Sequence, residues 1–153
     1  MPVAFNHIGI TVSEMGSSIA FYEALGFATG EVRDLRIVDQ EWMGRIVGFA
    51  PADIVVSVMT MGQTNIELIE YLEPKGGTTC PTDVNDVGSA HLGLEVADVA
   101  AEHARLSELG VRFRNPPLTI PADVPGFGGV EVVYGYDPDG NTFEMQTFPW
   151  TEL

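Results

Sequence analysis

The chain contains an internal repeat, and this repeat constrains the fold more than any other feature. Residues 6–27 read NHIGITVSEMGSSIAFYEALGF, and residues 90–111 read AHLGLEVADVAAEHARLSELGV. The offset is 84 for the histidines (91 − 7) and 84 for the Leu-Gly pairs (109 − 25), so no gap separates the two copies. Similarity at a fixed offset predicts two halves that fold alike.

Each half is predicted to begin with a strand and to continue with a helix. In the first half Ser13 is the predicted N-cap, and Gly26 suits the left-handed position after the helix. In the second half Asp98 and Gly110 take the same two positions. The helices are therefore expected just after the first strand of each half.

Strand-like alternation follows each helix. It predicts strands near residues 29–38, 54–61 and 65–72, and then near 111–114, 130–136 and 141–148. The turn sequence DPDG at 137–140 joins the last two as a hairpin, whereas the Pro- and Gly-rich segment 115–129 is expected to be a loop. Each half is thus βαβββ and the class is α+β. We expect one domain over residues 1–153, made of a module at 1–72, a linker at 73–87 and a module at 88–153.

Charge and composition exclude several classes of protein. The 22 acidic residues outnumber 7 Lys and Arg, which gives a formal net charge of −15 that disfavours nucleic acid. Neither a membrane-spanning apolar run nor a signal peptide is recognisable, so we expect a cytoplasmic protein. The single cysteine, Cys80, leaves histidines and carboxylates as the available metal ligands.

Two histidines and two glutamates occupy equivalent places in the two halves. Strand alternation puts His7 and His91 on the face opposite the one that the helix covers. Glu67 and Glu144 lie between apolar neighbours in the closing strands and are expected on that same face. If the halves pair into one continuous sheet, the four side chains converge into a site for a divalent first-row metal. A hydrogen-bonded core histidine is the alternative for each half, but the repetition favours the metal. His103, which has no counterpart, is expected to be a helix-flank residue.

Several segments resemble the vicinal oxygen chelate superfamily of glyoxalases, epimerases, extradiol dioxygenases and bleomycin or fosfomycin resistance proteins. They are NHIG at 6–9, AHLG at 90–93, FYEALGF at 21–27 and DPDGNTFE at 137–144. The resemblance implies a mixed sheet curled into a cup around a metal that chelates two neighbouring substrate oxygens. It also implies one divalent ion (Zn, Ni, Co, Mn or Fe) held by His7, Glu67, His91 and Glu144.

The first-half carboxylate Glu67 favours the four-ligand glyoxalase or epimerase branch, because the dioxygenases use two histidines and one carboxylate. We therefore expect a metal-dependent isomerase or lyase that moves a proton through a metal-stabilised enediolate. Glu144 or Glu67 is the expected base, as the glyoxalase resemblance suggests. Glu41 is a candidate second base for an epimerase, and Arg45 a candidate contact for an anionic group.

Two other functions stay open: an iron(II)-dependent ring-cleaving dioxygenase, and a non-catalytic small-molecule or drug-binding protein. The expected partner is a small molecule with vicinal oxygens, with no nucleic acid and no membrane. Unpaired sheet edges and the resemblance also predict a homodimer.

Overall fold

The computed structural model describes residues 4–49, 51–77 and 83–147. The chain divides into two compact units, Met1–Thr79 and Cys80–Leu153. Most of the linker predicted at 73–87 lies around this division, although β5 of the first unit extends to Glu73. Cys80 lies outside the described residues. Among those described, no helix is long and apolar enough to cross a membrane.

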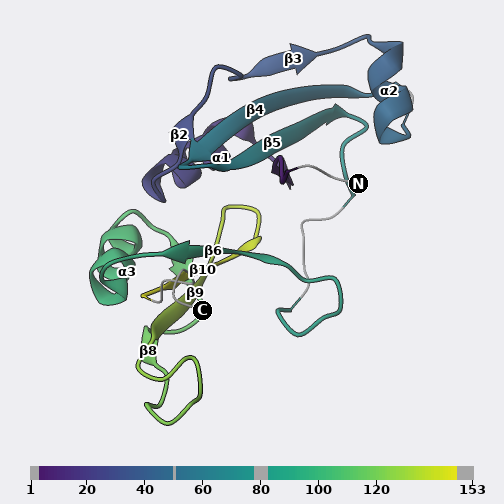
Figure 1. Cartoon of the computed structure of the whole chain (residues 1–153). Coiled ribbons are helices and arrows are strands. Elements are labelled where there is room, and N and C mark those ends of the chain that lie inside the picture. Colours follow the sequence, from purple (N-terminus) through teal and green to yellow (C-terminus); the bar gives the residue numbers. More distant parts are fainter. Residues whose placement is uncertain (1–3, 50, 78–82, 148–153) are drawn as a thin grey trace. The chain divides into compact units, whose positions relative to one another are not determined.

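The first unit is a mixed five-stranded sheet with two helices (Figure 1). Its elements are β1 (Ile8–Val12), α1 (Met15–Ala24), β2 (Ala28–Thr29), β3 (Leu35–Ile37), α2 (Glu41–Val47), β4 (Asp53–Met61) and β5 (Thr64–Glu73). The strand order is β1-β5-β4-β2, and β3 also pairs with β4. β1 and β5 run parallel, and the other strand pairs of this sheet are antiparallel. The last strand of the unit, β5, therefore lies beside the first strand, β1.

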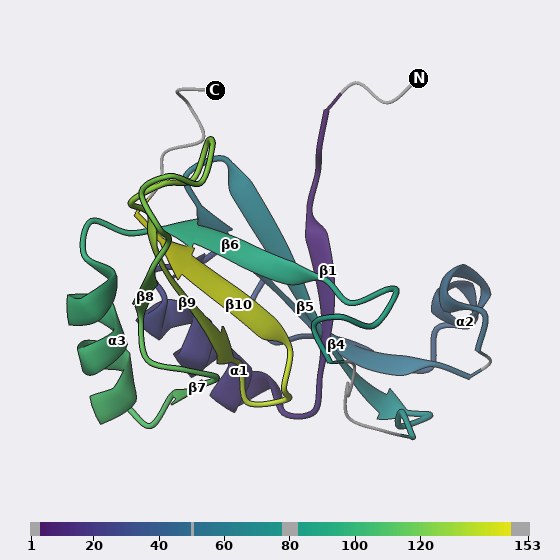
Figure 2. The same ribbon diagram turned by 90° about the horizontal axis from the view of Figure 1, so that it is seen from below.

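The second unit has the same topology, with β6 parallel to β10 in the order β6-β10-β9-β7 (Figure 2). Its elements are β6 (His91–Glu95), α3 (Val99–Glu108), β7 (Arg112–Phe113), β8 (Leu118–Thr119), β9 (Glu131–Tyr136) and β10 (Thr142–Gln146). The predicted α+β class and the βαβββ order are therefore confirmed. In both units the strand after the helix is split into two short pieces along one edge.

Apolar residues on alternate strand positions form the core between each sheet and its first helix. In the first unit Met59, Ile66 and Leu68 are fully buried, and α1 packs against the strands that carry them. In the second unit Val99 and Leu106 of α3 are buried with Phe143 and Met145 of β10. The intervening strand residues, including Glu67 and Glu144, are left on the opposite face. We call this the open face of each sheet.

α2 is an element that the sequence analysis did not predict. The helix has seven residues and no side-chain N-cap bond, although Glu41 in its first turn, Arg45 in its last turn and the left-handed Gly48 after it are favourable at helix ends. It forms because Met43 packs with Ala52, Ile54 and Val56, and with partly buried residues that include Val47. Ile54 and Val56 share their strand face with Val58, the cross-strand partner of Glu67, so α2 covers part of the open face that carries Glu67.

Three local expectations are corrected. The N-cap of α1 is Glu14 rather than Ser13, since its carboxylate accepts the N–H groups of Gly16 (2.9 Å) and Ser17 (2.7 Å). The segment 115–129 is not wholly irregular, because β8 pairs there with β9. The strand expected at 29–38 is interrupted between β2 and β3. Asp98 is the N-cap of α3 as predicted, and Gly26 and Gly110 both have positive φ.

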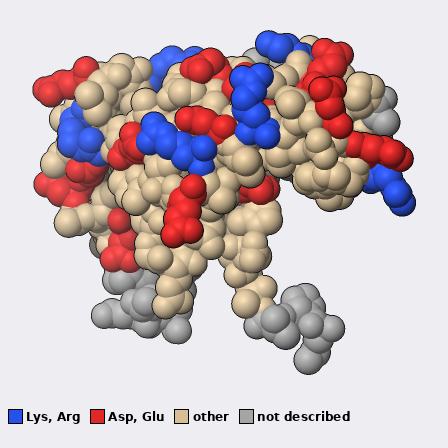
Figure 3. Space-filling view, turned by 90° about the horizontal axis from the view of Figure 1, so that it is seen from above, with Lys and Arg blue, Asp and Glu red and all other residues tan. Residues whose placement is uncertain are grey.

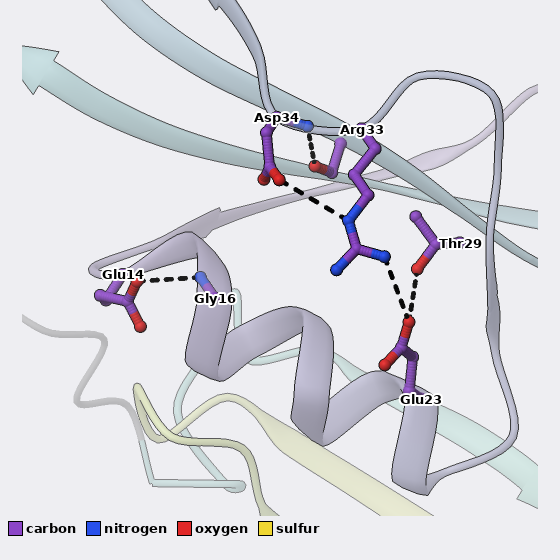
Figure 4. A network of polar contacts seen from close by, with 7 residues as sticks. Glu14, Gly16, Glu23, Thr29, Arg33 and Asp34 are labelled. Atoms are coloured by element: carbon purple, nitrogen blue, oxygen red, sulfur yellow. Dashed lines mark hydrogen bonds and ion pairs between the residues drawn. The ribbon is translucent and has the colours of Figure 1, made fainter.

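The interruption between β2 and β3 is held by polar contacts (Figure 4). Glu23 of α1 accepts a 2.7 Å hydrogen bond from the Thr29 hydroxyl and lies 3.8 Å from Arg33. The Asp34 N–H donates to the buried Ser57 hydroxyl at 2.9 Å. The Ser57 hydroxyl thus supplies a partner for a backbone N–H between the two strands, while the Glu23 contacts tie the segment to α1.

Candidate metal centre

The first candidate pair joins the start of β1 to the middle of β5. The parallel register places Gly9 beside Glu67, so His7, two residues earlier, projects from the same open face. His7 Nε2 lies 3.4 Å from Glu67 Oε2, and both side chains are partly exposed. Ile66 and Leu68, on either side of Glu67, are fully buried and fix the strand.

Asn6 contacts the nitrogen of the His7 ring that faces away from Glu67. His7 Nδ1 lies 2.6 Å from Asn6 Oδ1, an amide oxygen that can only accept a hydrogen bond. In the tautomer with the proton on Nδ1 this contact is a hydrogen bond, and Nε2 presents its lone pair towards Glu67 Oε2. In that tautomer a metal ion could bind both Nε2 and Oε2, while Asn6 holds the orientation of the ring through Nδ1.

The second candidate pair joins β6 to β10 in the equivalent place. Register pairs His91 with Thr142 and Gly93 with Glu144. His91 Nε2 lies 3.0 Å from Glu144 Oε2, and only 16% of the Glu144 side chain is exposed. The pair is therefore more enclosed and more closely spaced than the pair in the first unit.

Tyr134 is a neighbour of the second pair that the sequence analysis missed. It lies directly across from Glu144 in the β9–β10 ladder, and its ring meets the His91 ring edge-on at 5.3 Å between centroids. Burial, and then the negative charge of Glu144, raise the pKa of the Tyr134 hydroxyl. The hairpin turn at 137–140 fixes this register, so counting outwards from the turn could have placed Tyr134 opposite Glu144. The first unit has Val58 at the corresponding place across from Glu67.

Both pairs have a donor set and a spacing that fit a divalent metal. Imidazole nitrogens and carboxylate oxygens bind zinc and similar ions at about 2.0–2.2 Å, so two donors on neighbouring coordination positions lie about 3.0–3.4 Å apart. The distances in the two pairs are 3.4 Å and 3.0 Å. Among the described residues no three or more His, Cys, Asp or Glu side chains form a single metal-binding group. The structure thus brings each histidine to its own glutamate, and a four-ligand centre stays a prediction.

The other residues considered in the sequence have different places. His103 packs its ring on Phe113 at 4.3 Å between centroids, at the contact between helix and sheet. Glu41 lies in the first turn of α2 and Arg45 in its last, both exposed. The acidic side chains are spread over separate places on the face shown in Figure 3, with Lys and Arg among them.

Solved structures with the same fold cover nearly the whole chain. A glyoxalase family protein from Bacillus cereus has a TM-score of 0.78 and 21% identity over 95% of this chain and 94% of its own. A fosfomycin resistance protein from Listeria monocytogenes, solved with Mn(II) and sulfate, has a TM-score of 0.62 and 14% identity over 99% and 98%. A glyoxalase I mutant from Zea mays has a TM-score of 0.64 and 17% identity over 93% of this chain and 44% of its own.

No curated protein sequence matches the chain. A family profile does match, and it spans residues 4–145, which include both His–Glu pairs and all but the last strand residue of the two βαβββ units. The chain therefore belongs to the Glyoxalase/Bleomycin resistance protein/Dioxygenase superfamily, as the sequence resemblance implied.

Proposed function

We propose that the protein is a divalent-metal-dependent isomerase or lyase of the glyoxalase or epimerase type. The observation that carries the proposal is the recurrence of one His–Glu pair, with Nε2 facing Oε2, on the open face of each unit. His7, Glu67, His91 and Glu144 together would hold one ion, from the two units of one chain or from two chains. The substrate class is a small molecule with two neighbouring oxygens.

A bound divalent cation would supply Lewis acidity towards those two oxygens and acidify the carbon beside them. The chain supplies the base. One oxygen of Glu144 faces His91, which leaves the other free to take the proton from carbon and return it elsewhere on the substrate. Glu67 has the same arrangement with His7 and is the alternative base.

Metal content after dialysis tests the ligand set. We expect one divalent ion for each set of four ligands in the wild type and a large loss in His7→Ala and His91→Ala, because removing one ligand sharply lowers affinity. His103→Ala is the matched control, since that histidine packs on Phe113 instead. Full metal content in the His91→Ala protein would show that the site assignment is wrong.

Proton transfer is tested by solvent deuterium exchange over a panel of 2-hydroxy, 2-oxo and acyl-thioester compounds. We expect metal-dependent exchange of one carbon-bound hydrogen. Of the two variants Glu144→Gln and Glu67→Gln, the one that removes the base should abolish this exchange. Stoichiometric oxygen consumption with a catechol would instead support a ring-cleaving dioxygenase. Tight binding of a small molecule by metal-free protein would support a sequestering protein.

We also propose that the protein is a homodimer. Within the part of the chain that the structure describes, each sheet ends in strands with an unpaired edge, β1 and β2 in the first unit and β6 and β7 in the second, and such edges favour association. Two-fold dimers are the commonest oligomers. Light scattering at micromolar concentration and physiological salt should give twice the chain mass, and a value near 16.5 kDa would refute the proposal.

A further inference from the structure

Two arginines lie on the open face of the second unit, in line with the His91–Glu144 pair. Arg112 pairs with Tyr136 across β7 and β9, and the N–H of Arg114 donates to the Tyr134 carbonyl at 2.8 Å. Tyr134 in turn lies beside Glu144 on β10. Phe113, between the two arginines, points to the other face and packs on His103 and Phe143. Strand alternation therefore puts both guanidinium groups on the side of the sheet that carries the pair.

The repeat shows that the fold does not require arginine at these positions. The offset of 84 relates Arg112 to Ala28 and Arg114 to Gly30 (112 − 84 and 114 − 84). The backbone contacts are the same, because Ala28 pairs with Thr60 and the Gly30 N–H donates to the Val58 carbonyl at 2.8 Å. The edge strand of the first unit thus forms the same backbone contacts with an alanine and a glycine. The two arginine side chains are therefore not needed for this strand pairing.

The present contacts of the two arginines are weak. The Arg112 Cζ atom lies 5.8 Å from the centre of the Tyr136 ring. Arg114 donates to the Tyr136 hydroxyl and to Asp83, both at 3.3 Å, and 73% of the Asp83 side chain is exposed. Exposed ion pairs of this kind contribute little, so an incoming anion can replace Asp83 at low cost. By contrast Arg105, the third basic residue in 80–153, is held by Glu102 at 2.6 Å on α3.

We propose that Arg112, Arg114 and Tyr136 form a subsite for a carboxylate of the substrate. The inference rests on the proposed function and narrows its substrate class to carboxylate-bearing compounds with vicinal oxygens. Guanidinium groups match a planar carboxylate with two parallel N–H donors, and the Tyr136 hydroxyl adds a third. A singly charged carboxylate is favoured over a phosphate because the chain carries a net charge of −15. Two strand spacings of about 4.8 Å separate Glu144 on β10 from Arg112 on β7. The carboxylate of the substrate and its two neighbouring oxygens would therefore lie a few bonds apart.

Hydroxamates test the subsite, because they chelate a metal through two neighbouring oxygens. Each carboxylated hydroxamate can be compared with a form whose carboxylate is replaced by an uncharged amide. Acetohydroxamate, the monohydroxamates of succinate and glutarate, and their amide-capped forms would be titrated calorimetrically into Zn²⁺-loaded protein at low salt. In the wild type we expect one of the carboxylated chelators to bind about tenfold more tightly than its amide. In the double variant Arg112→Gln/Arg114→Gln the two affinities should become equal. The acetohydroxamate affinity should not change in that variant, which reports an intact site.

Arg105→Gln is the matched control, because it removes the same charge from the same unit on the helix side of the sheet. It should keep the preference for the carboxylated chelator. A preference that is absent in the wild type, or that survives in the double variant, would overturn the subsite while zinc-dependent acetohydroxamate binding still supports the proposed function. Hydroxamate binding that does not depend on zinc would overturn both.

Discussion

Gly135 in β9 offers a direct test of the packing behind the second His–Glu pair. It lies between Phe143 of β10 and Phe113 of β7 in the ladder. These two rings meet edge-on, with 5.8 Å between their centroids. A Cβ atom at Gly135 would overlap Phe143 Cζ and would lie 3.1 Å from Phe113 Cδ1. Phe143 is only 2% exposed, so its ring cannot swing away into solvent.

Gly135→Ala should therefore destabilise the fold. Overpacking a filled core costs about 1–3 kcal/mol, and the reduced freedom of the unfolded chain returns about 0.4–1 kcal/mol. The net loss of about 1–2 kcal/mol corresponds to a Tm lower by roughly 2–8 °C for a chain of this size. Because Phe143 precedes Glu144, we also expect weaker metal binding.

Thermal and urea unfolding followed by circular dichroism measure the effect. Gly9→Ala is the matched control, since Gly9 occupies a strand on the open face and a Cβ atom there meets nothing within 4 Å. That variant should unfold at the wild-type temperature or slightly above it. Equal Tm values for the two alanine variants would refute the packing argument.

Three further outcomes follow from local contacts and from the proposed site. Asp137→Ala should lower the free energy of unfolding by about 2 kcal/mol, because the buried carboxylate accepts the N–H groups of Asp139 (2.9 Å) and Asn141 (2.7 Å); urea unfolding checks this, and an unchanged midpoint would contradict it. Zn²⁺ at 100 times its Kd should stabilise the wild type by about 2.7 kcal/mol and have little effect on Glu144→Gln; a similar Tm rise in both proteins would count against Glu144 as a ligand. Hydrogen bonds from the backbone N–H groups of Ser17 and then Gly16 lower the pKa of Glu14 below its ordinary 4.5. The contribution of Glu14 to stability is thus complete above its pKa in the unfolded state and is lost as the pH falls through its pKa in the folded state. Acidification should therefore lower the wild-type Tm more steeply than the Tm of Glu14→Gln.

The repeat and the alternation of apolar residues were enough to predict the βαβββ order and the face on which each histidine and glutamate lies. Both signals are local: strand side chains alternate with a period of two, so buried Ile66 and Leu68 force Glu67 to the other face. The same reasoning applies to Glu144 between Phe143 and Met145. The Asp98 cap and the turn at 137–140 were likewise readable, because each satisfies its hydrogen bonds within a few residues.

Features that depend on residues far apart in the sequence were decided only by the tertiary structure. Glu14 caps α1 while Glu70, from β5, accepts the Met15 N–H at 2.9 Å, a contact that no local pattern reveals. α2 is short, and burial of Met43 against Ile54 and Val56 holds it in place. The alignment of Arg112 and Arg114 with Glu144 depends on the register of three strands, and register is set by packing and turns across the whole unit rather than by any one segment.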